Sequence, residues 1–150
     1  MTADYLGEAI EVAVHNVKTG GGPFGALLVT PEGDAYPAGN RVTANNDPTA
    51  HAEVMAIRAA CADRGTFDLS GCTLYSSCEP CPMCATAARW ARVERVVYAA
   101  DRHAAAAAGF DDSVFYDAIA EPDGLILGVE HAERLAPFET WAAAAARTPY

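Results

Sequence analysis

Hydrophobic positions recur at the spacing of an α-helix near the start of the chain. Over residues 3–18 they form one stripe, which predicts an amphipathic helix that the glycines at 20–22 terminate. The stripe consists of Leu6, Ile10, Ala13, Val14 and Val17. Further helices are predicted over residues 50–64, 81–91, 114–120 and 137–147.

Short apolar runs between turn-forming residues predict strands. Residues 25–30 and 35–40 flank a Pro- and Gly-containing turn, which is typical of a β-hairpin. The other predicted strands are residues 73–76, 95–100 and 125–129. Residues 41–49 are rich in turn formers, so we expect a loop there.

The order of these elements predicts the fold class. Strands separated by helices after an opening hairpin imply an α/β fold, with a central mixed sheet and helices on both faces. No repeat, linker or low-complexity tract divides residues 1–150. We therefore expect a single domain.

Charge and composition restrict the classes of function. The chain has 10 basic and 20 acidic residues, a formal net charge of −10. A field of this sign repels phosphate backbones, so we expect no nucleic-acid partner. No apolar run reaches the length of a membrane span, and the first residues lack the pattern of a secretory signal. We therefore expect no membrane partner and a cytoplasmic location.

The five cysteines indicate a metal rather than disulfides. An odd count in a cytoplasmic chain argues against a disulfide framework. Cys78, Cys81 and Cys84 lie within seven residues, and such crowding in a reducing compartment is typical of metal ligands. Cys61 and Cys72 are most simply small core residues.

Two short segments contain the residues of a catalytic zinc site. His51 opens one predicted helix, while Cys81 and Cys84, three positions apart, open another and direct their sulfurs the same way. Helix N-termini stabilise thiolates, and two sulfurs with one imidazole select zinc. Three protein ligands leave a fourth position for water, whose pKa zinc lowers to about 7. Glu53, two residues from the histidine, is placed to shuttle protons.

A closed structural zinc site is the main alternative. In it Cys78 would be a fourth ligand, and the chain would be a non-catalytic module stabilised by zinc. Cys78 precedes Pro80 and the predicted helix, however, and a structural site has no use for Glu53. The sequence therefore favours a three-ligand catalytic site with Cys78 free.

The joint pattern resembles a known enzyme family. His51-Ala-Glu53 followed by Pro80-Cys-Pro-Met-Cys84 matches the motif of the zinc-dependent nucleobase and nucleoside deaminases. The resemblance implies their three-layer α/β/α sandwich, the cytidine deaminase-like fold, which agrees with the predicted element order. Within this superfamily the chain is most similar to the bacterial guanine deaminases. The stretches that carry this closer resemblance are residues 21–26, 46–54, 77–84, 109–113 and Tyr150.

The resemblance implies a reaction and its participants. It implies one zinc per chain and hydrolytic deamination of a free purine base, guanine to xanthine and ammonia, by zinc hydroxide with Glu53 as proton shuttle. Asp112 would assist proton transfer at the leaving amine. The residues implied to contact the base are Phe24 and Trp90 as pocket walls, Asn40 at the base edge and Tyr150 as the closing residue.

The resemblance also implies an assembly and leaves the substrate partly open. We expect a homodimer in which residues from about 120 to 150 are exchanged between chains, although residues 120–128 do not align with the family. Another aminated ring, such as guanosine, cytosine or a triazine, is the alternative substrate. A tRNA adenosine deaminase shares the zinc motif but needs a basic surface, which a net charge of −10 does not provide.

Overall fold

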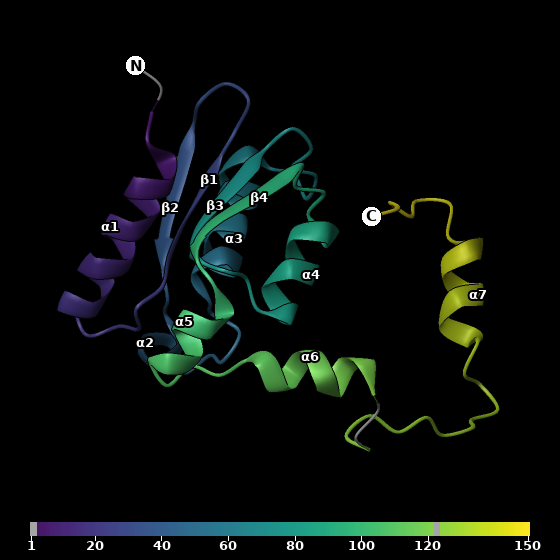
Figure 1. The fold of residues 1–150 in the computed structure, drawn as a ribbon. Coiled ribbons are helices and arrows are strands. Elements are labelled where there is room, and N and C mark those ends of the chain that lie inside the picture. The colour runs from purple at the N-terminus through teal and green to yellow at the C-terminus, as the bar shows by residue number, and fades with distance from the viewer. Residues whose placement is uncertain (1–2, 122–123) are drawn as a thin grey trace. The chain divides into compact units, whose positions relative to one another are not determined.

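The computed structural model describes residues 3–121 and 124–150 (Figure 1). The chain divides into two units, one ending at Tyr116 and one spanning Asp117–Tyr150, and each is described by itself. None of the described helices is both long and apolar enough to cross a membrane.

The secondary structure follows the predicted order closely. The strands are β1 (Gly25–Val29), β2 (Ala35–Gly39), β3 (Thr73–Cys78) and β4 (Arg95–Ala100). The helices of the first unit are α1 (Tyr5–Lys18), α2 (Val42–Asn45), α3 (Ala52–Arg64), α4 (Pro82–Trp90) and α5 (Arg102–Ala107). Helix α6 (Ser113–Ala120) crosses the boundary between the units, and α7 (Ala136–Ala143) lies in the second.

The four strands form one mixed sheet in the order β2-β1-β3-β4, which confirms the predicted α/β class. Strand β1 is antiparallel to both β2 and β3, while β3 and β4 are parallel. Parallel neighbours need a crossover connection, and α4 provides it between β3 and β4.

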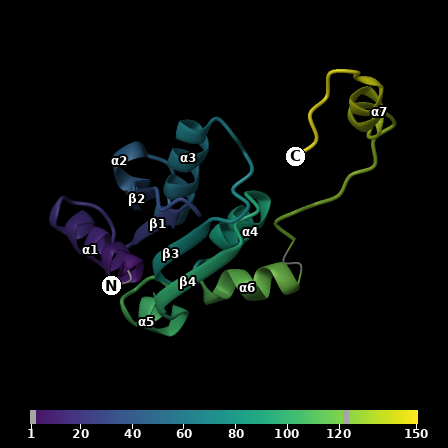
Figure 2. The same cartoon turned by 90° about the horizontal axis from the view of Figure 1, so that it is seen from above.

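Helices cover both faces of the sheet, as the sequence predicts. Figures 1 and 2 show α1 on one side and α3 on the other. The α1 side buries Ala9 against Leu27 and Val29, and the α3 side buries Leu28 and Leu74 against the alanines of α3. Strand β1 is therefore buried along its whole length and shows no polar alternation.

A glycine allows α1 to approach the sheet. A Cβ at Gly25 would collide with the backbone of Ala9 and Ala13, so only glycine fits where the helix crosses β1. This close approach fixes the start of β1, next to Phe24.

Two sequence predictions are wrong, and both concern segments outside the sheet. The loop predicted over residues 41–49 contains the short helix α2, which Asn46 ends in the left-handed conformation at φ 49°. The strand predicted over residues 125–129 does not form. A strand needs a neighbour for its backbone hydrogen bonds, and the described residues of the second unit contain no other strand that could pair with this segment.

Candidate active site

The starts of two helices carry the three predicted metal ligands. His51 is the N-cap residue of α3, Cys81 is the N-cap residue of α4, and Cys84 follows in the first turn of α4. Pro82 occupies the first helical position, where its missing N–H costs no hydrogen bond. Strand β3 returns the chain from the end of α3 to the start of α4, so residues thirty positions apart meet at one place.

The geometry of the three ligands fits zinc. The His51 Nδ1 atom lies 3.6 Å from the Cys81 Sγ and 3.5 Å from the Cys84 Sγ, and the three ligand atoms all lie within 4.8 Å of one another. A tetrahedral zinc with ordinary Zn–S and Zn–N bond lengths separates a sulfur from a nitrogen ligand by about 3.6 Å. The three side chains therefore need little movement to hold a zinc ion.

Electrostatics prepares one of the two thiols for metal binding. Hydrogen bonds from Cys84 and His51 lower the pKa of the Cys81 thiol to about 4. The contact with Cys81 raises the pKa of Cys84, which is the donor, and raises the pKa of His51. The N-terminus of α4 also favours a thiolate at this position.

The predicted proton shuttle is buried beside the ligands. Glu53 is the second residue of α3 and only 6% exposed, and burial raises the pKa of its carboxyl. The Ser76 hydroxyl on β3 donates a hydrogen bond to its Oε1 atom at 3.2 Å. A carboxyl with a raised pKa can both accept and return a proton near neutral pH, as a general acid–base group must.

The remaining cysteine of the segment, Cys78, points elsewhere. The Cys78 thiol lies 3.8 Å from the backbone carbonyl of Asp101, and burial raises its pKa to about 11. Among the described residues, the group able to hold a metal contains His51, Cys81 and Cys84 but not Cys78. The geometry thus supports the open three-ligand site over the closed alternative. Cys61 and Cys72 are free thiols in or against the core, as predicted.

Asp112 lies just before α6 with part of its carboxyl enclosed. Its Oδ1 atom is buried and has no hydrogen-bond partner among the described residues. Burial raises the pKa of this carboxyl, and the charge on Cys81 raises it further. A buried oxygen without a partner, within electrostatic reach of a ligand thiolate, is what a proton-transfer group awaiting substrate would show.

Two predicted base contacts meet at the edge of the sheet. Phe24 precedes β1 and Asn40 follows β2, and the Asn40 N–H donates to the Phe24 carbonyl at 3.1 Å. The Phe24 ring packs edge-on against Phe110 with centroids 5.0 Å apart. A cavity of about 380 Å³ borders both rings, but its lining lies against α1 and α5 and includes none of the three ligands.

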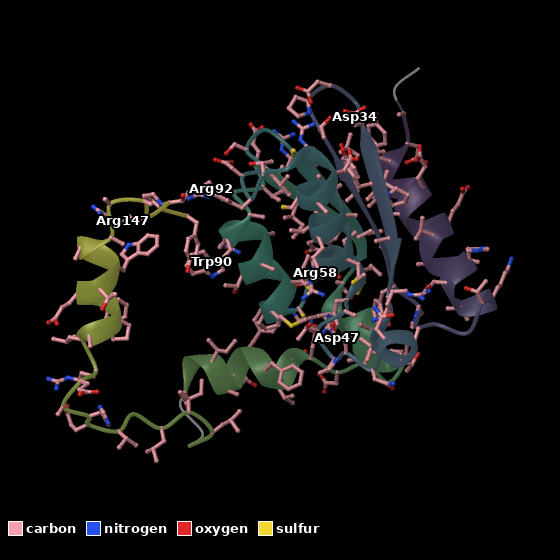
Figure 3. All side chains as sticks on the ribbon, turned by 180° about the vertical axis from the view of Figure 1, so that it is seen from behind. Asp34, Asp47, Arg58, Trp90, Arg92 and Arg147 are labelled. Atoms are coloured by element: carbon pink, nitrogen blue, oxygen red, sulfur yellow. The ribbon has the colours of Figure 1, made fainter. Side chains whose placement is uncertain are left out.

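Within the first unit, one predicted base contact lies away from the ligands. Trp90, labelled in Figure 3, is the last residue of α4 and 65% exposed. The helix rise places it about 13 Å from Cys81, at the opposite end of the helix. Tyr150 belongs to the second unit, where its ring packs edge-on against Trp141 at 6.5 Å. The substrate roles of Trp90 and Tyr150 stay predictions.

Sequence reasoning missed two residues that contact predicted site residues. Ser76 lies two residues after Leu74 and on the same buried face of β3. A polar residue at that buried position was the available signal. Phe110 lies in the stretch that carries the family resemblance, and only the fold shows its packing against Phe24.

Comparisons with known proteins agree with this site. Residues 2–100 match the model of the cytidine and deoxycytidylate deaminase zinc-binding region. The chain is 47% identical over 142 residues to guanine deaminase of Bacillus subtilis, covering 91% of each protein. It is 43% identical over 102 residues to the tRNA-specific adenosine deaminase of that organism, covering 67% of this chain and 63% of that protein.

Solved structures show the same similarity in three dimensions. The X-ray structure of Bacillus subtilis guanine deaminase superimposes with a TM-score of 0.95 at 46% identity, over 100% of this chain and 99% of that one. The structure of a guanine deaminase from Nitrosomonas europaea superimposes with a TM-score of 0.69 at 33% identity, over 75% of this chain and 66% of that one. The ligand set, the fold and these matches together show that the chain belongs to the cytidine and deoxycytidylate deaminase family of zinc enzymes.

Proposed function

We propose that this protein is a zinc-dependent guanine deaminase, which hydrolyses guanine to xanthine and ammonia. The observation that carries the proposal is similarity to one guanine deaminase along almost the whole chain, with 47% identity over 91% of both proteins and a structural superposition over 100% of this chain. The tRNA-specific adenosine deaminase of Bacillus subtilis matches only 67% of the chain, and that of Haemophilus influenzae matches 87% of it at a lower identity of 33%. A net charge of −10 also opposes binding of an RNA substrate.

His51, Cys81 and Cys84 would hold the zinc ion. Zinc bound by these ligands activates water for attack near neutral pH. The chain supplies the remaining chemistry, which is to hold the base, exclude bulk water and move two protons.

Glu53 is the group proposed to move the first proton. Its buried carboxyl accepts a proton from the attacking water and delivers it to the ring nitrogen beside the amino-bearing carbon. Protonation makes that carbon electrophilic, and the water oxygen bonds to it. The hydrogen bond from Ser76 keeps one carboxylate oxygen oriented while the other is used.

Glu53 and Asp112 share the second half of the reaction. The carbon–nitrogen bond breaks as the amine receives the second proton of the water, so one water yields one new carbonyl and one ammonia. The partly enclosed carboxyl of Asp112 would assist this protonation, which its buried Oδ1 atom and raised pKa support.

The base would be held by Phe24, Asn40, Trp90 and Tyr150. An aromatic wall suits the faces of a purine, and an amide side chain pairs with its polar edge. In the first unit the Asn40 Oδ1 atom accepts a hydrogen bond from the Val42 N–H at 3.3 Å, which orients the amide.

The active form is proposed to be a cytoplasmic homodimer, with residues 1–150 acting as one deaminase domain. Five free cysteines suit a reducing compartment. The second unit exposes many large apolar side chains, which favours contact with a partner chain. Light scattering should give twice the mass of one chain, whereas the mass of a single chain would contradict the dimer.

Ammonia release from a panel of substrates tests the proposed reaction. We expect fast release from guanine and slow release from guanosine, cytosine, an aminated triazine and a tRNA anticodon stem. Glu53→Gln, with its zinc content measured, is the negative control for contaminating deaminase. Preference for any other member of the panel would reject guanine and leave the zinc deaminase assignment intact.

A further inference from the structure

The segment that carries Asp112 is tied to the segment that carries the zinc ligands by three side chains. Glu79, two residues before Cys81, accepts hydrogen bonds from the backbone N–H and the Nε of Arg102, at 3.1 and 3.0 Å. The Arg102 guanidinium lies over the ring of Tyr116, 4.1 Å from its centroid. The Tyr116 hydroxyl donates to the backbone carbonyl of Pro80 at 2.8 Å. We call Glu79, Arg102 and Tyr116 the latch.

The latch contacts are stronger than ordinary surface contacts. The Glu79 side chain is only 14% exposed, so its ion pair with Arg102 is less screened by solvent than a surface pair. Its two oxygens accept from two different donors of one residue, which fixes both the direction and the position of Arg102. The guanidinium face remains available for the ring of Tyr116.

The latch residues bracket Asp112 along the chain. Arg102 begins α5, ten residues before Asp112, and Tyr116 lies four residues after Asp112, in the first turn of α6. Asp112 has no side-chain hydrogen bond of its own at Oδ1 among the described residues, so its place depends on the backbone around it. The latch anchors that backbone to Glu79 and Pro80, directly before Cys81.

We infer that Glu79, Arg102 and Tyr116 are positioning residues, which hold the Asp112 carboxyl against the zinc-ligand loop for protonation of the leaving amine. The inference rests on the proposed function, because it needs Asp112 to act in turnover. It predicts that a weakened latch lowers kcat through Asp112 alone, while the KM for guanine, set by residues on other elements, changes little.

A double-mutant cycle on the full-length, zinc-loaded protein tests this inference. Tyr116→Phe removes only the hydroxyl, and we expect a three- to tenfold lower kcat, the order of one hydrogen bond, with zinc content unchanged and KM within about twofold. In an Asp112→Asn background the same change should have no further effect. Arg102→Lys keeps the charge but loses the planar fork, and it should behave in the same way.

Tyr36→Phe is the matched control. It removes a phenol hydroxyl that donates to Asp63 at 2.7 Å, outside the site, and should leave kcat unchanged in both backgrounds. Equal losses from Tyr116→Phe with and without Asp112→Asn, or no loss at all, would overturn the positioning role. If Asp112→Asn itself turns over guanine normally, the catalytic role of Asp112 fails first and removes the basis of the latch.

Discussion

The two units of the chain have similar kinds of side chains and use them differently. In the first unit, apolar residues such as Leu28 and Leu74 are completely buried between the sheet and its helices. In the second, Ile126 is 91% exposed and Phe138 is 70% exposed. The large apolar residues that this unit exposes are Ile119, Leu125, Ile126, Leu127, Val129, Leu135, Phe138, Trp141 and Tyr150.

The difference shows that hydrophobic residues stabilise a fold only where a second layer covers them. Burial contributes about 25 cal/mol for each Å² of apolar surface removed from water, so an exposed side chain contributes almost nothing. Helix α7 has eight residues, and isolated helices of under about 12 residues are marginal in water. The first unit therefore has its own core, whereas the second unit exposes its large apolar side chains within one chain.

The largest expected effect concerns the chemistry of the first unit. Glu53→Gln keeps the shape of the side chain but cannot carry a proton, so turnover of guanine should fall by about 100- to 10,000-fold. Ammonia release measures the loss. Metal analysis and circular dichroism should show unchanged zinc and unchanged secondary structure. Turnover within threefold of the starting protein would exclude Glu53 from the mechanism.

The next effect compares a buried apolar side chain of the first unit with an exposed one of the second. Leu74→Ala opens a cavity in the sheet core and should lower the free energy of unfolding by about 2 to 5 kcal/mol. The matched variant in the second unit is Phe138→Ala. Because that ring is exposed within one chain, this change should instead weaken the dimer and raise its dissociation constant about tenfold.

Chemical denaturation at several protein concentrations separates these two outcomes. The loss from Leu74→Ala should be the same at every concentration, whereas the loss from Phe138→Ala should vanish at concentrations where both proteins are monomeric and reach its full size where both are dimeric. A loss from Phe138→Ala that is independent of concentration would mean that the second unit has a core within its own chain.

A smaller effect is expected from the end of the second unit. Deleting Pro149 and Tyr150 should lower kcat/KM for guanine by about tenfold. The reason is that one ring packed against a substrate contributes roughly 1.4 kcal/mol of binding free energy. Zinc content should stay unchanged, because the ligands lie in the first unit. Steady-state kinetics with guanine and guanosine measure the change. Unaltered guanine kinetics would remove Tyr150 from the pocket.

The smallest effect sharpens the description of the metal site. Cys78→Ser should leave zinc content full and activity within about twofold, because the Cys78 thiol contacts the Asp101 carbonyl rather than the metal ligands. Metal analysis after dialysis is the measurement, with Cys84→Ser as the matched variant that should lose zinc. Loss of zinc from both variants would indicate a closed four-ligand site.

Much of the fold and of the metal site is predictable from the sequence. The spacing of His51, Cys81 and Cys84 identifies the ligands, because they lie at the starts of two helices and helix starts are marked by local signals. The β1–β2 hairpin and the two strands of the parallel pair, β3 and β4, follow from runs of a few apolar residues between turns. These features depend on neighbours close in sequence, which is the information that periodicity and motifs contain.

The tertiary structure alone decides the rest. The hydrogen bond from Ser76 to Glu53 and the latch from Arg102 to Glu79 each join residues 23 positions apart, and the register of β3 and β4 sets which side chains meet. The strand expected over residues 125–129 fails for the same reason, because strand formation depends on a partner as well as on apolar residues. Local sequence determines which elements can form and which atoms could bind zinc. Only the packing of distant segments determines which of those elements are covered and how the groups around the metal are held.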